Sequence, residues 1–284
     1  MSTRRYDALL VDLDGTLLDE SGKIHPRTKA ALRAAEAGGV RVMIATGRST
    51  ISTRPVVEEL GLETPALVFN GAGLWCPVKQ RMLEERVLGK RTLERALRYG
   101  AERDLLTVLM SAETKMANTP RNQLETDALR GLMGLRIVPR AELNAEFVIR
   151  VTYYSQDHES SLALAEDVRA FVDQPVYMTH FPLNWLPTHR ESPASCLDLH
   201  PPCKGKAEGL RMLEERYGIP AERVVAVGDA TNDIPMFEAA GLAVAMQDGM
   251  PEALAAADRV IGDNDSTALA ELVEELFLDG VPAV

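Results

Sequence analysis

The sequence predicts an α/β fold with a doubly wound, mostly parallel sheet and an inserted α+β module. Near both ends of the chain, short apolar runs typical of buried strands alternate with segments of helical periodicity. That order predicts parallel strands joined by crossover helices, whereas the middle of the chain lacks regular alternation. The runs expected as strands of the parallel sheet are residues 8–11, 40–45, 66–69, 224–228, 243–246 and 259–261.

The irregular middle of the chain sets the expected domain boundaries. We expect residues 1–83 and 189–284 to form the main domain and residues 84–188 to form the inserted module. Inside the module, Phe147, Ile149, Val151 and Tyr153 alternate as one apolar side of a strand. The module's expected helices are 93–103 and 162–172, and its expected strands are 105–110, 146–154, 176–178 and 185–187.

Length, charge and cysteine content limit the class of protein. At 284 residues the chain can hold two domains, and its net charge of −11 argues against nucleic acid or an anionic membrane as a partner. No apolar run approaches the ~18 residues of a membrane span, and residues 1–7 lack a signal-peptide core. Three scattered cysteines without a C-x-x-C pair fit a reducing, cytoplasmic location.

Two carboxylates follow the first apolar run. Asp12 and Asp14 are two residues apart, so an extended chain would place both on one face at the strand's C-terminal end. Paired carboxylates suit a hard cation such as Mg²⁺, and one can act as nucleophile while the other handles protons. The alternative is a polar turn, because Asp and Gly15 are common turn formers.

The second strand also ends in polar groups. The Thr46 hydroxyl and the Gly47 amide could donate to a phosphate oxygen, although Thr46 could equally cap the following helix. Arg48 could pair with an anion or face solvent. After the third strand, Asn70 and Gly71 predict a turn.

Two later segments also begin helices. Lys204 opens the helix at 203–217. A positive charge at a helix N-terminus is unfavourable because of the helix dipole, unless the ammonium points at a bound anion. Lys206 is the competing candidate for an anion-binding lysine. Further on, an apolar strand ends at Gly228, and Asp229, Asn232 and Asp233 follow. Three oxygen-bearing side chains within five positions can surround a hard cation, although Asn232 or Asp233 alone could simply cap a helix.

These motifs together resemble the haloacid dehalogenase (HAD) superfamily. The run Asp12-Leu13-Asp14-Gly15-Thr16 is similar to its first signature, Thr46-Gly47 to its second, Lys204-Gly205 to its third and the Gly228–Asp233 run to its fourth. Asn70-Gly71-Ala72 resembles the Cof-type branch. The resemblance implies a Rossmann-like catalytic core with an inserted cap of the mixed α/β kind called C2B, which would exclude water and contact the substrate's non-phosphate end.

The resemblance also implies a phosphatase mechanism. Asp12 attacks phosphorus, and Asp14 protonates the leaving group and then activates water. Mg²⁺ is held by Asp12, Asp229 and the backbone carbonyl of Asp14, with Asp233 supporting the metal or its waters. Lys204, Thr46 and Gly47 contact the phosphate together with Asn232. The family pattern favours Lys204 over Lys206, so Lys206 is expected to be a solvated surface lysine.

Alternatives within and outside this class stay open. A phosphomutase would need the same Asp pair, and a non-catalytic regulator could bind a phosphometabolite. A dinucleotide-binding dehydrogenase is disfavoured because no G-x-G-x-x-G follows a strand.

Gln247-Asp248-Gly249 and Asp265-Ser266-Thr267 depart from the family pattern outside the chemical signatures. In the module, Trp185 is expected in the core, and His180 and His189 form no metal-site spacing.

The expected partner is a small phosphorylated metabolite, bound by a monomer or homodimer. A sugar phosphate, flavin mononucleotide or pyridoxal phosphate would each fit the implied chemistry.

Overall fold

The computed structural model describes residues 4–278, so both ends of the expected main domain and part of the 1–7 segment lie outside the described residues. The described chain divides into two compact units. Unit 1 contains residues 4–48, 53–84 and 204–278, and unit 2 contains residues 49–52 and 85–203.

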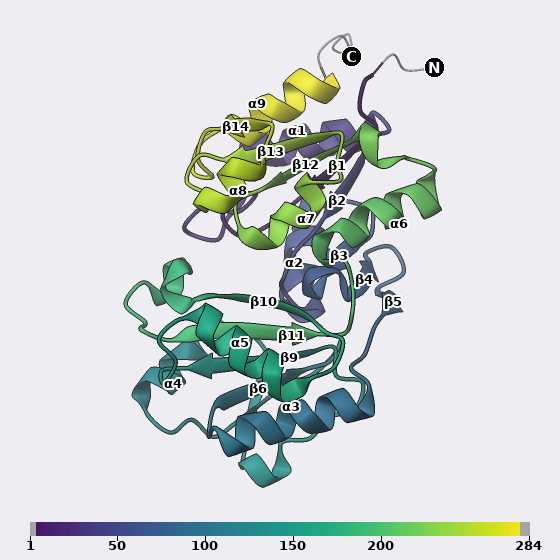
Figure 1. The fold of residues 1–284 in the computed structure, drawn as a ribbon. Coiled ribbons are helices and arrows are strands. Elements are labelled where there is room, and N and C mark those ends of the chain that lie inside the picture. Colours follow the sequence, from purple (N-terminus) through teal and green to yellow (C-terminus); the bar gives the residue numbers. More distant parts are fainter. Residues whose placement is uncertain (1–3, 279–284) are drawn as a thin grey trace. The chain divides into compact units, whose positions relative to one another are not determined.

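Unit 1 is built on a five-stranded parallel sheet that contains five of the six predicted strands (Figure 1). The run expected at 66–69 is wrong for this sheet, because its strand pairs antiparallel in a separate small sheet. The strand order of the five-stranded sheet is β14-β13-β12-β1-β2, and every neighbouring pair is parallel. The first strand of the chain therefore lies in the interior, beside a strand more than 200 residues later. The strands are β1 (Ala8–Val11), β2 (Arg41–Ile44), β12 (Val224–Gly228), β13 (Leu242–Met246) and β14 (Arg259–Ile261).

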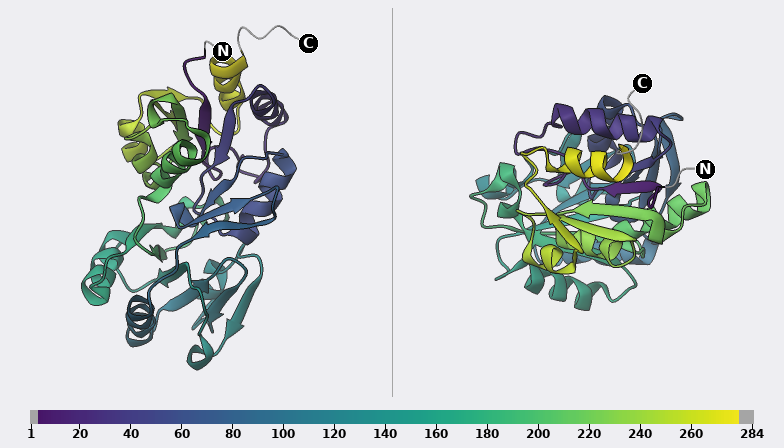
Figure 2. Two further views of the ribbon diagram at one scale, coloured as in Figure 1. Left: turned by 90° about the vertical axis from the view of Figure 1, so that its right-hand side faces the viewer. Right: turned by 90° about the horizontal axis from the view of Figure 1, so that it is seen from above.

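Helices cover both faces of this sheet, as a doubly wound fold requires. Leu9 and Val11 of β1 pack in one apolar cluster with Leu32 of α1 (Pro26–Ala37) and with α9 (Ala268–Val273). Leu10 has the opposite orientation and packs against Gly209 of α6 (Glu208–Tyr217). In the right-hand view of Figure 2, purple α1 and yellow α9 lie on one side of the sheet and the green helices on the other.

A small antiparallel sheet follows the second crossover. β3 (Ala66–Val68) pairs with β4 (Gly73–Cys76), which is followed by β5 (Arg81–Glu85). A single parallel bridge, Ala45 to Leu67, links β3 to the end of β2. The remaining helices with residues in unit 1 are α2 (Thr50–Leu60), α7 (Ile234–Phe237) and α8 (Pro251–Ala256), with short turns η1 (Phe69–Gly71), η5 (Gly205–Ala207), η6 (Ala221–Arg223), η7 (Thr231–Asp233) and η8 (Glu274–Leu278).

Unit 2 has a six-stranded mixed sheet with the order β10-β11-β9-β6-β7-β8. Only β7 and β8 pair in parallel; the other neighbours are antiparallel. The strands are β6 (Leu106–Met110), β7 (Lys115–Asn118), β8 (Leu135–Val138), β9 (Arg150–Ser155), β10 (Tyr177–Pro182) and β11 (Ser195–His200). This is the α+β character that the irregular alternation predicted.

One face of the unit 2 sheet packs against two helices, α3 (Lys90–Glu102) and α5 (Ser161–Val172). Val151 and Tyr153 of β9 and Leu197 of β11 lie in that apolar core. Shorter elements are α4 (Gln123–Ala128), η2 (Arg140–Glu142), η3 (Leu183–Trp185) and η4 (Pro187–His189).

Four expectations for the middle of the chain are wrong. Trp185, expected in the core, is 40% exposed in η3 (Leu183–Trp185). The expected module end at 188 is too early, because β11 pairs with β9 and β10 rather than with the parallel sheet. The expected strand at 185–187 is occupied by parts of the two short turns η3 and η4. Phe147 lies before β9 in a left-handed conformation and is exposed. Val148, rather than Ile149, packs in the apolar core with Val151 and Tyr153, so the expected alternation holds only within β9.

None of the described helices is long and apolar enough to cross a lipid bilayer.

Candidate active site

Two parallel strands of unit 1 end side by side and place their acids together. β1 and β12 pair with Val11 opposite Val227, and the Asp12 amide donates to the Val227 carbonyl at 3.0 Å. Asp12 follows β1 directly, and Asp229 follows β12 directly. The expected meeting of these two acids at the C-terminal edge of the sheet therefore follows from adjacent strands with matched ends.

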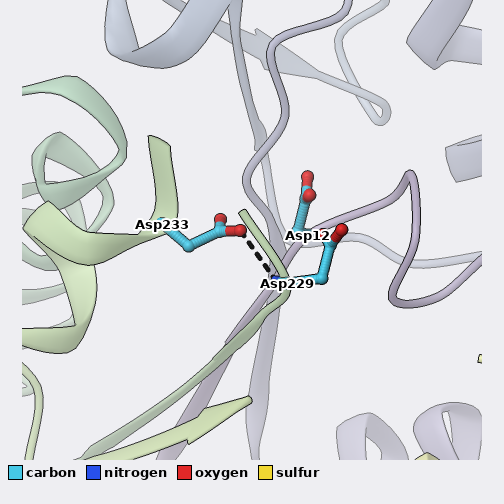
Figure 3. Close-up of side chains that lie close together, drawn as sticks. All are labelled: Asp12, Asp229 and Asp233. Atoms are coloured by element: carbon cyan, nitrogen blue, oxygen red, sulfur yellow. Dashed lines mark hydrogen bonds between the residues drawn. The ribbon is translucent and has the colours of Figure 1, made fainter. Parts of the chain in front are cut away.

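A third carboxylate completes a cluster that we call the carboxylate cluster: Asp12, Asp229 and Asp233 (Figure 3). Each offers one oxygen within 4.8 Å of the others, and all three residues are buried. The Asp233 side chain is oriented by accepting from the Asp229 amide at 3.0 Å and the Ala230 amide at 2.9 Å. Three buried carboxylates form the all-oxygen donor set that a hard divalent cation such as Mg²⁺ prefers.

Two glycines leave room for this cluster. A Cβ atom at Gly228 would lie 2.3 Å from the Asp233 carboxyl carbon, and one at Gly15 would lie 2.3 Å from Asp229 Oδ2. Gly15 also has a φ of +74°, which disfavours other residues. Any side chain at either position would push an acid out of the cluster.

The lysine in contact with this cluster is Lys206, and the expectation that Lys206 is solvated is wrong. Lys206 is fully buried, with its Nζ 2.8 Å from Asp12 Oδ1 and 2.6 Å from Asp233 Oδ1. Lys204 has an exposed side chain, and its amide donates to Glu208. Gly205 lies between the two lysines with a φ of +61°, and the tight turn η5 then directs Lys206 inward.

The charges of the site are unbalanced. Burial raises the pKa of Asp12 to about 7, and the Asp233 and Asp14 charges add to the rise although Lys206 opposes it. Burial and the charges of Asp12 and Asp233 also raise the pKa of Asp229 well above its usual range. For Lys206, burial alone would lower the pKa, but Asp12 and Asp233 outweigh it and raise it. One ammonium among three carboxylates leaves a demand for further positive charge.

Asp14 lies outside the carboxylate cluster. β1 ends at Val11, so the expected shared face of Asp12 and Asp14 on an extended strand does not exist; Asp12 is buried and Asp14 is exposed. Arg48 donates to both oxygens of Asp14, from Nε at 2.8 Å and from Nη2 at 2.5 Å. Of the two roles left open for Arg48, pairing with an anion is the one observed, and the anion is a side chain of this chain.

The remaining expected residues gather in the same unit. Thr46 is buried just after β2, and its hydroxyl accepts from the Arg48 amide at 3.1 Å. Asn232 in η7 donates to the Asn70 side chain at 3.0 Å. Gly47 lies against the same Asn70 amide, since a Cβ there would be 3.1 Å from Asn70 Oδ1.

Sequence reasoning missed two contacts of this site. The Thr16 hydroxyl donates to Asp229 at 3.3 Å, and Asn70, expected only as a turn former, connects to Asn232. Asn70 does also form the predicted turn, with a left-handed φ of 49°. Thr16 lies within the first motif, so its position was a usable signal; no local pattern distinguishes a bridging Asn70 from a simple turn.

Comparison with known proteins finds relatives that match almost the whole chain. A family model described as haloacid dehalogenase-like hydrolase matches residues 9–273. The chain is 26% identical to the phosphatase YwpJ of Bacillus subtilis, covering 95% of this chain and 99% of that protein. It is 28% identical to the pyridoxal phosphate phosphatase YbhA of Escherichia coli, covering 96% and 98%.

Solved structures support the fold. A haloacid dehalogenase-like hydrolase from Bacteroides thetaiotaomicron superposes with a TM-score of 0.78 at 23% identity, covering 96% of this chain and 100% of that one. A sugar phosphatase of HAD subclass IIB gives a TM-score of 0.78 at 20% identity, covering 95% and 98%.

Proposed function

Since the chain belongs to the haloacid dehalogenase-like hydrolase family and is a phosphatase of its Cof-type branch, we propose that it hydrolyses small phosphorylated metabolites with Mg²⁺ through an aspartyl-phosphate on Asp12. The observation that supports this best is the carboxylate cluster with Lys206. A buried nucleophile candidate contacts one ammonium and lies beside two further acids, so the site has an excess of negative charge that a divalent cation would offset before an anionic substrate binds.

The carboxylate cluster fits the metal by its donor chemistry. Asp12 and Asp229 would hold Mg²⁺, joined by the backbone carbonyl of Asp14, and Asp233 would support the metal or its waters. When bound, the ion would offset negative charge on the phosphoryl oxygens.

Asp12 is proposed as the nucleophile. Its free carboxylate oxygen attacks phosphorus, a new P–O bond forms, and the bond from phosphorus to the leaving oxygen breaks. Lys206 holds the Asp12 carboxylate through the other oxygen and supplies positive charge in place of Lys204. The Thr46 hydroxyl and the Gly47 amide donate to the transferring group, and Asn232 contacts it from the η7 side.

Asp14 is proposed to move the protons. It gives a proton to the leaving alkoxide, then takes one from the water that attacks the aspartyl-phosphate and releases inorganic phosphate. Arg48 occupies both oxygens of Asp14, so this ion pair must open before the transfer. The pair therefore represents a resting arrangement of the acid.

The names of the relatives support a proposed substrate class. One relative is named a pyridoxal phosphate phosphatase, another a 5-amino-6-(5-phospho-D-ribitylamino)uracil phosphatase, and a structural neighbour a sugar phosphatase. The substrates in all three names are small phosphorylated metabolites. We propose sugar phosphates or phosphorylated cofactors as substrates, unit 2 as the inserted cap module, and a reducing, cytoplasmic location that fits three cysteines scattered along the sequence.

The first test replaces the nucleophile. Asp12→Asn should lower kcat for p-nitrophenyl phosphate with Mg²⁺ by about 10⁴-fold or more, since the covalent route is lost. Asp19→Asn, in the following loop, is the matched control and should keep activity. Acid quenching of the wild type during turnover should trap one phosphoryl group on the peptide containing Asp12. Near-normal turnover by Asp12→Asn would refute the nucleophile assignment.

A further inference from the structure

The three-residue turn η1 has an unusual backbone. Phe69, Asn70 and Gly71 have φ angles of 53°, 49° and 92°, so three consecutive residues lie in the left-handed region. Gly71 adopts this region freely and Asn70 tolerates it, but for a bulky residue such as Phe69 it is strained. Strain of this kind persists only where surrounding contacts hold it, and such places are often functional.

The backbone of η1 contacts two of the loops that form the site. The Phe69 amide donates to the Arg48 carbonyl at 2.9 Å, and the Asn70 amide donates to the Thr46 carbonyl at 3.0 Å. Gly71 lies so close to the next loop that a Cβ there would be 2.1 Å from the Gly205 carbonyl oxygen. The turn η1 therefore packs between the Thr46–Arg48 loop and the residue that precedes Lys206.

The Asn70 side chain adds contacts to a third loop. It is 2% exposed, and its Oδ1 accepts from Asn232 Nδ2 at 3.0 Å. The same amide lies against Gly47, where a Cβ would be 3.1 Å from Asn70 Oδ1 and 3.2 Å from Nδ2. One buried side chain thus touches both Gly47 and Asn232.

Asn232 is held at one end only. Its Oδ1 is buried and has no hydrogen-bond partner among residues 4–278. A buried acceptor without a partner is rare in folded proteins, and such groups occur where a ligand or its water is bound. The bond from Asn70 therefore orients an amide whose other end is still available.

We propose that Asn70 is a positioning residue for phosphoryl transfer. It orients the Asn232 amide and supports the Gly47 peptide, and it does not itself touch the phosphoryl group. The inference rests on the proposed function, in which Asn232 and Gly47 contact the phosphate. Because phosphoryl transfer depends mainly on positioning and preorganised donors, removing the Asn70 side chain should lower kcat.

The sharpest variant is Asn70→Gly, because glycine keeps the left-handed backbone and removes only the amide side chain. Gln80→Gly is the matched control: Gln80 is also left-handed at φ 51°, also lies in unit 1, and also uses its amide in hydrogen bonds, but at an exposed turn. Both variants should show similar thermal unfolding. Asn70→Gly should lower kcat for p-nitrophenyl phosphate about 10- to 100-fold, and Gln80→Gly should not.

A double-mutant cycle separates positioning from a general structural effect. If Asn70 acts through Asn232, then Asn232→Ala should lower kcat in the wild type and cause little further loss in Asn70→Gly. The proposal would be overturned if the two kcat losses multiplied in the double variant. It would also be overturned if Asn70→Gly kept kcat within twofold of wild type. If Asn70→Gly does not fold, Asn70→Asp replaces it, because an aspartate oxygen can still accept from Asn232. Adding Asn232→Ala to Asn70→Asp should then still lower kcat. An unchanged kcat in that double variant would overturn the proposal.

Binding of inorganic phosphate gives a readout independent of turnover. Calorimetry with Mg²⁺ should show phosphate affinity lowered about 10-fold in Asn70→Gly and unchanged in Gln80→Gly. If the wild type does not hydrolyse phosphoesters, or if Asp12→Asn turns over normally, the proposed function is wrong. The phosphate affinity would still test the positioning role of Asn70 in that case. Equal phosphate affinity in wild type and Asn70→Gly would overturn the positioning role.

Discussion

Two buried ionic groups, one in each unit, differ in their balance of charge. In unit 1, the carboxylate cluster sets three acids against the single ammonium of Lys206. In unit 2, Arg150 and Asp198 pair at 3.1 Å, and the Thr152 hydroxyl donates to the other Asp198 oxygen at 2.5 Å.

The difference distinguishes the proposed ligand site from a structural contact. The Arg150–Asp198 pair is neutral as a whole, and both oxygens of Asp198 have partners, so no further ion is needed to balance its charge. The carboxylate cluster keeps excess negative charge in a buried place, and the raised pKa values of Asp12 and Asp229 record the cost. Such imbalance is tolerated where binding a cation or exchanging protons is the function.

The largest effect that would sharpen this comparison is expected at Lys206. Lys206→Met keeps most of the side-chain volume and removes the ammonium, so kcat should fall about 10²- to 10³-fold. The metal-free protein should also lose about 3 kcal/mol of unfolding free energy, because the acids lose their only cationic partner among the described residues. Kinetics and denaturant unfolding measure the two effects.

Lys204 provides the matched control for Lys206. Because its side chain is exposed, Lys204→Met should change stability by no more than about 0.5 kcal/mol and leave kcat close to wild type. Equal losses in both variants would contradict the assignment of Lys206.

A smaller effect, on stability alone, is expected at Asp198. Asp198→Asn keeps the shape but leaves the Arg150 charge buried without its carboxylate, and should cost about 3 kcal/mol of unfolding free energy. Turnover of p-nitrophenyl phosphate at a temperature where the variant stays folded should match wild type. A selective loss of turnover with unchanged unfolding would mean that the pair is functional after all.

The smallest effect is the response to Mg²⁺, and it should depend on pH. The folded pKa of Asp12, about 7, lies above the value of about 3.9 for an unfolded Asp. The metal-free fold therefore binds the proton more tightly than the unfolded chain, so this residue's contribution to stability rises as pH falls from above 7 towards 4. At high pH the ionised site is destabilising until a cation occupies it.

Added Mg²⁺ should therefore stabilise the protein more at pH 8 than at pH 6, by up to about 2.7 kcal/mol at a concentration 100-fold above Kd. Thermal unfolding with Mg²⁺ or with EDTA at both pH values measures this, and Asp229→Asn should reduce the response. A larger Mg²⁺ effect at pH 6 would contradict the proposed metal ligands.

The sequence alone determined which strand ends would supply the acids. Buried apolar runs ending in Asp12 and in Asp229, each joined to the rest of the sheet by crossover helices, predict parallel strands whose carboxyl ends share one edge. Local periodicity is enough for this because a strand's end and its first polar residue are local features. The parallel sheet itself was predicted for the same reason.

Only the tertiary structure decided between the two lysines and assigned the last strand of unit 2. Lys204 and Lys206 lie two residues apart at the same helix start, and the left-handed turn at Gly205, packed against Gly71, determines which one turns inward. Likewise, Ser195–His200 looks like any buried strand, and its pairing with β9 and β10 involves residues distant in sequence. Periodicity reports burial, whereas choosing among partners depends on packing between segments that no local pattern describes.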